Sequence, residues 1–157
     1  MVKNFFSDLE NSKQAEQVAR ECLSALTSDY TFSDVSNIRD YFYKGDIMAV
    51  GADGSRTFIE VKQDSRIHET GNVLCEEKVL FFDSGMKNGN MQSNYDVYCV
   101  VSIAARKMWL FDFNIMKANY KKGRYIKIPH EEQITFAYLV PIAAFEEMGA
   151  LIAEISY

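Results

Sequence analysis

The fold of this chain is decided by the stretch Lys44-Gly-Asp-Ile-Met-Ala-Val-Gly-Ala-Asp-Gly-Ser-Arg-Thr-Phe-Ile-Glu-Val-Lys62. Two runs with the composition of β-strands, residues 41–50 and 56–62, lie on either side of a glycine-bearing turn, which is typical of a β-hairpin. A loop of three residues, 52–54, with Gly54 in the left-handed region is a favoured connection between such strands. The stretch therefore predicts an antiparallel hairpin.

The length of the loop fixes which residues of the hairpin face each other. With a three-residue loop, Ala49 lies opposite Thr57, and Asp46 lies opposite Glu60. A two-residue loop would instead place Asp46 opposite Val61 and turn the two carboxylates to different faces of the sheet. The first register is the one we predict, because it matches the favoured loop.

Two opposed carboxylates and a nearby lysine suggest a catalytic site. Directly opposed residues have Cβ atoms about 5 Å apart, and like charges there are destabilising unless a counter-charge is present. Mg²⁺ suits Asp46 and Glu60, because it prefers carboxylate, carbonyl and water oxygens. Lys62 projects from the same face as Glu60, where it can position or deprotonate an attacking water, or neutralise charge on a phosphate oxygen. The simpler interpretation is a solvated strand face with a weak surface ion pair.

The rest of the chain predicts a mixed α/β domain, with helices packed on a central sheet. A helix is expected over residues 5–27, an irregular strand over 31–39 and a polar loop over 84–93. The later expected elements are an extended segment at 73–82, a hairpin at 95–103 and 107–114, a short helix at 114–122, a strand at 134–140 and a helix at 142–155.

Composition narrows the class of protein. The 157 residues are 48% hydrophobic and 25% charged, which suits one globular domain over residues 1–157 and excludes disorder. The net charge of −5 argues against a generally basic nucleic-acid coat protein. No apolar run suits a signal peptide or a membrane span, and three scattered cysteines favour reduced thiols. We therefore expect a cytoplasmic protein without a membrane partner.

Gly45-Asp46-Ile47, followed by Ile59-Glu60-Val61-Lys62, resembles the signature of the PD-(D/E)XK, or restriction-endonuclease-like, nuclease superfamily. That signature is an acidic residue entering one strand and an acidic-x-Lys on the next, preceded by a helix. The chain departs from the pattern at Gly45, where many members have proline. The resemblance implies a central mixed β-sheet flanked by helices, Mg²⁺ (or Mn²⁺) as cofactor, and cleavage of phosphodiester bonds in DNA. The resemblance is also compatible with a homodimer.

The resemblance assigns roles to matching residues. Asp46 and Glu60 would be metal ligands, the backbone carbonyl of Val61 would also contact the metal, and Lys62 would be the catalytic lysine. Glu16, on the expected first helix, is a candidate further metal ligand. Glu10 is its rival, although a capping box that starts at Ser7 accounts for Glu10 without chemistry.

A basic segment downstream is a candidate surface for DNA phosphates. Its cations, which alternate with Tyr120 and Tyr125, are Lys117, Lys121, Lys122, Arg124 and Lys127. A solvated helix face and loop explain the segment equally well.

The sequence leaves three functions open. The first is a Mg²⁺-dependent nuclease acting on DNA. The second is a nuclease-fold module that binds nucleic acid or a protein partner without cutting. The third is an interaction protein of unrelated α/β fold, in which Glu60 and Lys62 are merely exposed.

Overall fold

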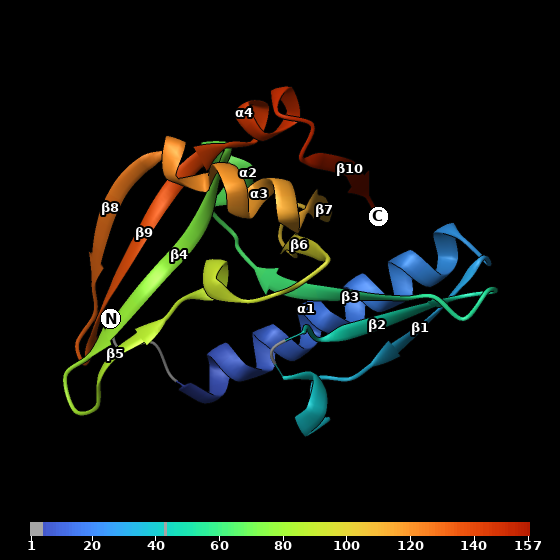
Figure 1. Ribbon diagram of the computed structural model, residues 1–157, viewed down its shortest axis with the longest axis horizontal. Coiled ribbons are helices and arrows are strands. Elements are labelled where there is room, and N and C mark those ends of the chain that lie inside the picture. The colour runs from blue at the N-terminus through green and yellow to red at the C-terminus, as the bar shows by residue number, and fades with distance from the viewer. Residues whose placement is uncertain (1–4, 43) are drawn as a thin grey trace.

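The computed structural model, which describes residues 5–42 and 44–157, contains a six-stranded sheet in the order β1-β2-β3-β6-β7-β10 (Figure 1). Only the central pair, β3 and β6, is parallel, so the sheet is mixed. Its strands are β1 (Tyr30–Asp34), β2 (Ile47–Gly51), β3 (Arg56–Gln63), β6 (Val97–Ser102), β7 (Lys107–Asp112) and β10 (Leu151–Ser156).

A second sheet of four antiparallel strands, in the order β5-β4-β9-β8, packs against one face of the first sheet. In Figure 1 it extends to the left, away from the β2–β3 hairpin. Its strands are β4 (Asn72–Phe81), β5 (Gly85–Asn88), β8 (Arg124–Pro129) and β9 (Gln133–Pro141).

The six-stranded sheet has a hydrophobic core on each face. Helix α1 (Phe5–Leu26) places Ala15, Ala19 and Leu23 against strand residues such as Ile59. The core on the other face joins the two sheets and is rich in aromatic side chains, including Phe111. The shorter helical elements are α2 (Ile67–Thr70), α3 (Phe113–Asn119), α4 (Ile142–Glu147), η1 (Arg39–Tyr41), η2 (Asn90–Gln92) and η3 (Tyr120–Lys122).

The expected helix over residues 142–155 is confirmed as far as Glu147 and is wrong beyond it. Helix α4 ends at Glu147, Gly149 has φ +79°, and β10 then pairs with β7 at the edge of the sheet. A φ of that sign is readily available to glycine and stops a helix. The following residues alternate between half-buried and exposed positions, as the side chains of an edge strand do.

Smaller differences concern segments with little local signal. The expected loop at 84–93 contains β5 and η2, and β8 was not predicted. The expected strand at 41–50 is shorter, since η1 occupies its beginning and β2 starts at Ile47. The first helix, the two hairpins, β4 and β9 confirm the predictions for those segments. In the described part of the chain, no helix is both long and apolar enough to cross a membrane.

Candidate active site

The β2–β3 hairpin has the predicted register. Ala49 is paired with Thr57, and the Gly51 amide donates to the Ser55 carbonyl at 2.9 Å. The loop of residues 52–54 contains Gly54 with φ +82°, as the favoured three-residue connection requires. The register is therefore the one that the three-residue turn predicts.

Asp46 lies where regular pairing of the hairpin stops. The last paired residues are Ile47 and Ile59, and the Asp46 amide donates to the Ile59 carbonyl at 2.8 Å. Beyond this point β3 continues without β2, and Oδ2 of Asp46 accepts a hydrogen bond from the Val61 amide at 2.9 Å. The carboxylate therefore takes the place of a backbone acceptor and is held at the open edge of β3.

Glu60 is buried beside Asp46, with an exposed fraction of 8%. The two carboxyl groups lie in hydrogen-bonding contact with each other. Burial and, after it, the contact with Asp46 raise the pKa of Glu60 to about 8, although the charge of Lys62 opposes the shift. A cation bound here would relieve the repulsion between the two carboxylates that raises the pKa of Glu60.

Tyr95 is a contact of the site that the sequence did not indicate. Its hydroxyl is hydrogen-bonded to Glu60, and burial together with the Glu60 charge raises the pKa of Tyr95 above its ordinary value. The ring is 5% exposed and packs edge-on against Phe113 with centroids 4.9 Å apart. Tyr95 comes close to Glu60 because β6 pairs with β3, which no local pattern reveals.

Helix α1 forms the opposite wall of the site through Glu16. A hollow of about 250 Å³ is lined by Asn11, Ser12, Glu16, Asp46, Glu60, Val61, Lys62 and Gln63. Burial is the main cause that raises the pKa of Glu16 to about 7, and the charges of Asp46 and Asp34 add to it. Glu10 is exposed and does not line the hollow, and α1 begins at Phe5, so Ser7 lies within the helix and cannot be its N-cap.

The donor set at this hollow suits a hard divalent cation that keeps part of its water shell. Among residues 5–42 and 44–157, no three or more Asp, Glu, His or Cys side chains lie close enough together to hold a metal ion by themselves. The Asp46–Glu60 pair supplies two carboxylates, which is the usual number for Mg²⁺, whose remaining ligands are mostly waters. The two carboxylates of this pair are therefore the main ligands available to a divalent cation, and Glu16 lies on the facing wall of the hollow.

The raised pKa of Glu60 predicts how stability depends on pH. Between pH 4.5, its ordinary value, and about 8, folded Glu60 keeps a proton that the unfolded chain has released. The metal-free protein is therefore expected to lose stability, on the order of a few kcal/mol, as the pH rises through this window. Thermal melting in EDTA at a series of pH values measures the loss.

Glu60→Gln is expected to make this pH profile shallower, because the amide cannot ionise, while Glu16, whose pKa is also raised, keeps its own part of the slope. Glu10→Gln, at an exposed position of the same charge, is the matched control and should follow the unmodified protein. Parallel profiles for Glu60→Gln and the unmodified protein would contradict the assignment.

The predicted phosphate-binding cations are not equally available. Lys117 donates to the Ser93 carbonyl at 2.8 Å, Lys121 pairs with Glu77 at 3.0 Å, and Lys127 lies over the Phe136 ring. Lys122 and Arg124 are exposed. Several cations of this segment therefore already have partners within the chain, and their role in binding DNA stays a prediction.

The fold has a counterpart among solved structures. No family model matches the chain, and no curated protein sequence matches it. The fold is similar to that of a bacterial homing endonuclease, I-Ssp6803I, with a TM-score of 0.51 and 13% sequence identity, over 82% of this chain and 77% of that chain. At this identity the likeness concerns the fold alone. It agrees with the expected α+β architecture built on a central mixed β-sheet.

Proposed function

We propose that this protein is a metal-dependent nuclease of the PD-(D/E)XK type that hydrolyses phosphodiester bonds in DNA. The observation that carries the proposal is the meeting of Asp46 and Glu60 at one hollow that Lys62 also lines. The fold shared with a homing endonuclease supports the choice of DNA as substrate. The signature residues of the superfamily occupy the same hollow, which supports the choice of type.

Each residue of the hollow has a distinct task in this proposal. Asp46 and Glu60 would hold Mg²⁺ or Mn²⁺, and Val61 would add its carbonyl, since the Val61 amide already turns to the open edge of β3 beside Asp46. When bound, the ion polarises the scissile phosphate and lowers the pKa of a coordinated water. Lys62 places its ammonium group beside the phosphate, where it stabilises charge that develops on an oxygen. Glu16 would orient waters from the opposite wall of the hollow.

Cleavage assays test the proposal directly. The purified protein is incubated with supercoiled, linear duplex, branched and single-stranded DNA, each with Mg²⁺, Mn²⁺ or EDTA. We expect cleavage of at least one form that depends on the divalent ion. Intact DNA under all of these conditions would overturn the proposal, and a protein that binds DNA without cutting would instead fit the non-catalytic module.

Tyr95 is expected to act as a positioning residue for Glu60. Tyr95→Phe removes the hydroxyl that orients this carboxylate, and loss of such an outer hydrogen bond typically weakens metal binding by about 10–100-fold. Calorimetric titration with Mn²⁺ measures the change, and thermal melting checks the fold. Tyr125→Phe, which removes an exposed hydroxyl on β8, is the control and should bind Mn²⁺ normally. Equal Mn²⁺ affinities in the two variants would exclude this role of Tyr95.

A further inference from the structure

The face of β3 that carries Glu60 continues beyond the candidate active site. Ile59 and Val61 point to α1, as members of the core under that helix. Side chains alternate along a strand, so the intervening residues point the other way. Those residues are Arg56, Phe58, Glu60 and Lys62.

Phe58 contacts one aromatic ring and one cation, and a second cation contacts that aromatic residue. The Tyr41 ring lies with its centroid 5.2 Å from that of Phe58, and Nζ of Lys44 lies 5.2 Å from the Phe58 centroid. Nη1 of Arg56 donates to the Tyr41 hydroxyl at 3.4 Å. Lys44 and Arg56 are exposed, while both rings are half-buried. We name this group of four residues, Tyr41, Lys44, Arg56 and Phe58, the β3 cluster.

We propose that the β3 cluster binds the nucleotides next to the scissile phosphate, with Lys44 and Arg56 at the phosphates and the rings of Phe58 and Tyr41 against an unstacked base. This inference rests on the proposed function, because the position of the scissile phosphate is set by Asp46 and Glu60. It adds a binding surface to that function.

The spacing along β3 favours a strand of nucleic acid as the ligand. Phe58 is two residues from Glu60, which is about 7 Å along a β-strand. One nucleotide of an extended strand spans a comparable distance, so Lys44 and then Arg56 would meet successive phosphates beyond the metal. Cations that follow a backbone, together with a ring on which a base can stack, are the usual elements of single-strand binding.

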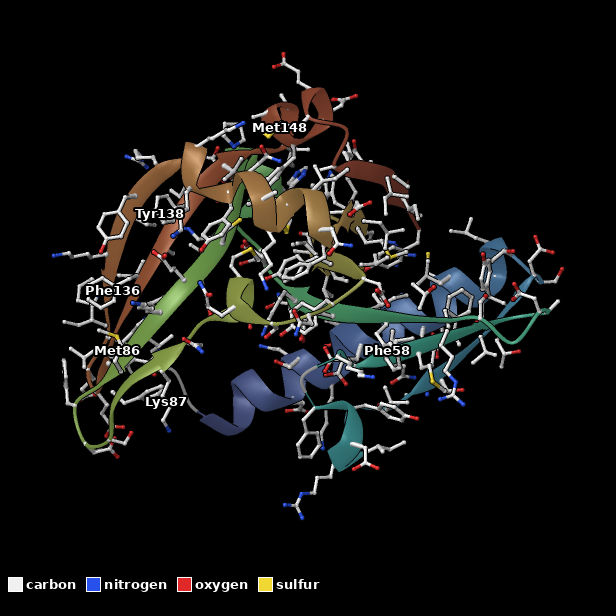
Figure 2. The ribbon with its side chains drawn as sticks, viewed as in Figure 1. Phe58, Met86, Lys87, Phe136, Tyr138 and Met148 are labelled. Carbon is white, nitrogen blue, oxygen red and sulfur yellow. The ribbon has the colours of Figure 1, made fainter. Side chains whose placement is uncertain are left out.

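The charges around the cluster agree with a polyanionic ligand. Asp96 lies on the side facing β6, where its carboxylate accepts the Phe58 amide at 2.8 Å and so already has a partner. Lys44 and Arg56 bring two positive charges to the β3 cluster, and Lys62 brings a third to the neighbouring hollow. In Figure 2, Phe58 on the β2–β3 hairpin lies far from Phe136 and Tyr138 of the second sheet. The β3 cluster is therefore separate from the basic segment on α3 and β8.

A binding measurement tests the two cations. Fluorescence anisotropy of a labelled single-stranded oligonucleotide is recorded with Ca²⁺ at several salt concentrations, and a denaturing gel verifies that the probe stays intact. The Lys44→Gln/Arg56→Gln double variant is expected to bind at least tenfold more weakly at low salt. Its slope of log K against log salt should fall by about 0.7 for each phosphate that the protein no longer neutralises.

Lys107→Gln is the matched control, because it removes a cation from β7, where Lys107 pairs with Glu154 at 3.4 Å. It should bind the oligonucleotide as the unmodified protein does. If the double variant and Lys107→Gln share one affinity and one slope, the inference is overturned.

A second variant tests the aromatic surface. Phe58→Leu keeps an apolar side chain but removes the ring, and base–ring stacking typically contributes about fivefold or more to binding. Phe82→Leu, at a ring that is 60% exposed beyond β4, is the control. Weaker binding confined to Phe58→Leu supports the inference. Equal binding by these two variants overturns the stacking contact.

The cleavage assay distinguishes failure of this inference from failure of the proposed function. If the unmodified protein cuts DNA and the double variant binds as the control does, the β3 cluster is excluded and the nuclease stands. If the unmodified protein cuts no DNA and the double variant still loses binding, the nuclease is excluded and the binding surface stands.

Discussion

Asp46→Asn is expected to slow DNA cleavage by about 10²–10³-fold or more, since it removes a charge that the metal and the developing transition state require. The substitution should leave the fold intact. An asparagine side chain has nearly the same shape, and its carbonyl oxygen can still accept the Val61 amide that Oδ2 of Asp46 accepts at 2.9 Å. Initial cleavage rates in Mg²⁺ measure the loss, and circular-dichroism melting measures stability.

The control for this substitution is Asp53→Asn, which removes an exposed carboxylate from the loop of the same hairpin. Asp53→Asn should cut DNA at the rate of the unmodified protein. Glu60→Gln and Lys62→Ala are expected to lose cleavage as Asp46→Asn does. If Asp46→Asn is as active as Asp53→Asn, the carboxylate pair is not the catalytic centre.

The part of the site that the sequence predicts correctly is the part that a local turn determines. Gly54 fixes the length of the hairpin loop, and the register of the loop brings Asp46 beside Glu60. The resulting contact between the two carboxyl groups agrees with the predicted convergence. This convergence can be predicted from the hairpin sequence alone, without contacts to distant segments of the chain.

The features that the sequence does not predict depend on pairing between distant segments. Tyr95 reaches Glu60 only because β6 lies beside β3 in the parallel pair, and parallel strands are joined by long connections without a turn signal. The β3 cluster likewise requires η1, which positions Tyr41, in a segment expected to be extended. The second sheet is a further example. In it β8 and β5 form strands by pairing with β9 and β4.

Near the end of the chain, the spacing of the apolar residues is compatible with both a helix and a strand. Phe145, Met148, Leu151 and Ile155 recur at helical spacing, which favoured a helix to the end of the chain. Leu151 and Ile155 also fit the alternation of an edge strand, and β7 offers unpaired backbone groups at that place. The edge of the sheet decides the outcome in favour of the strand.

Gly45→Ala is expected to be the most damaging small substitution near the site. Gly45 has φ +141°, and a Cβ atom there would lie 2.7 Å from the backbone carbonyl oxygen of Ile59. The same φ excludes proline at this position, because the proline ring fixes φ near −65°. We expect Gly45→Ala to destabilise the fold by about 3 kcal/mol or more, from backbone strain and a clash that moves β3. Urea unfolding measures this free energy.

Gly54→Ala separates the clash from the strain. Gly54 also has a positive φ, +82°, but a Cβ atom there would meet nothing within 4 Å. Its replacement should therefore cost only the strain, roughly 1–2 kcal/mol, and leave cleavage unchanged. Gly45→Ala should in addition reduce cleavage, because Asp46 follows directly and its amide is bonded to Ile59. If the two variants are equally stable and equally active, the close approach of Gly45 to β3 does not hold Asp46 in place.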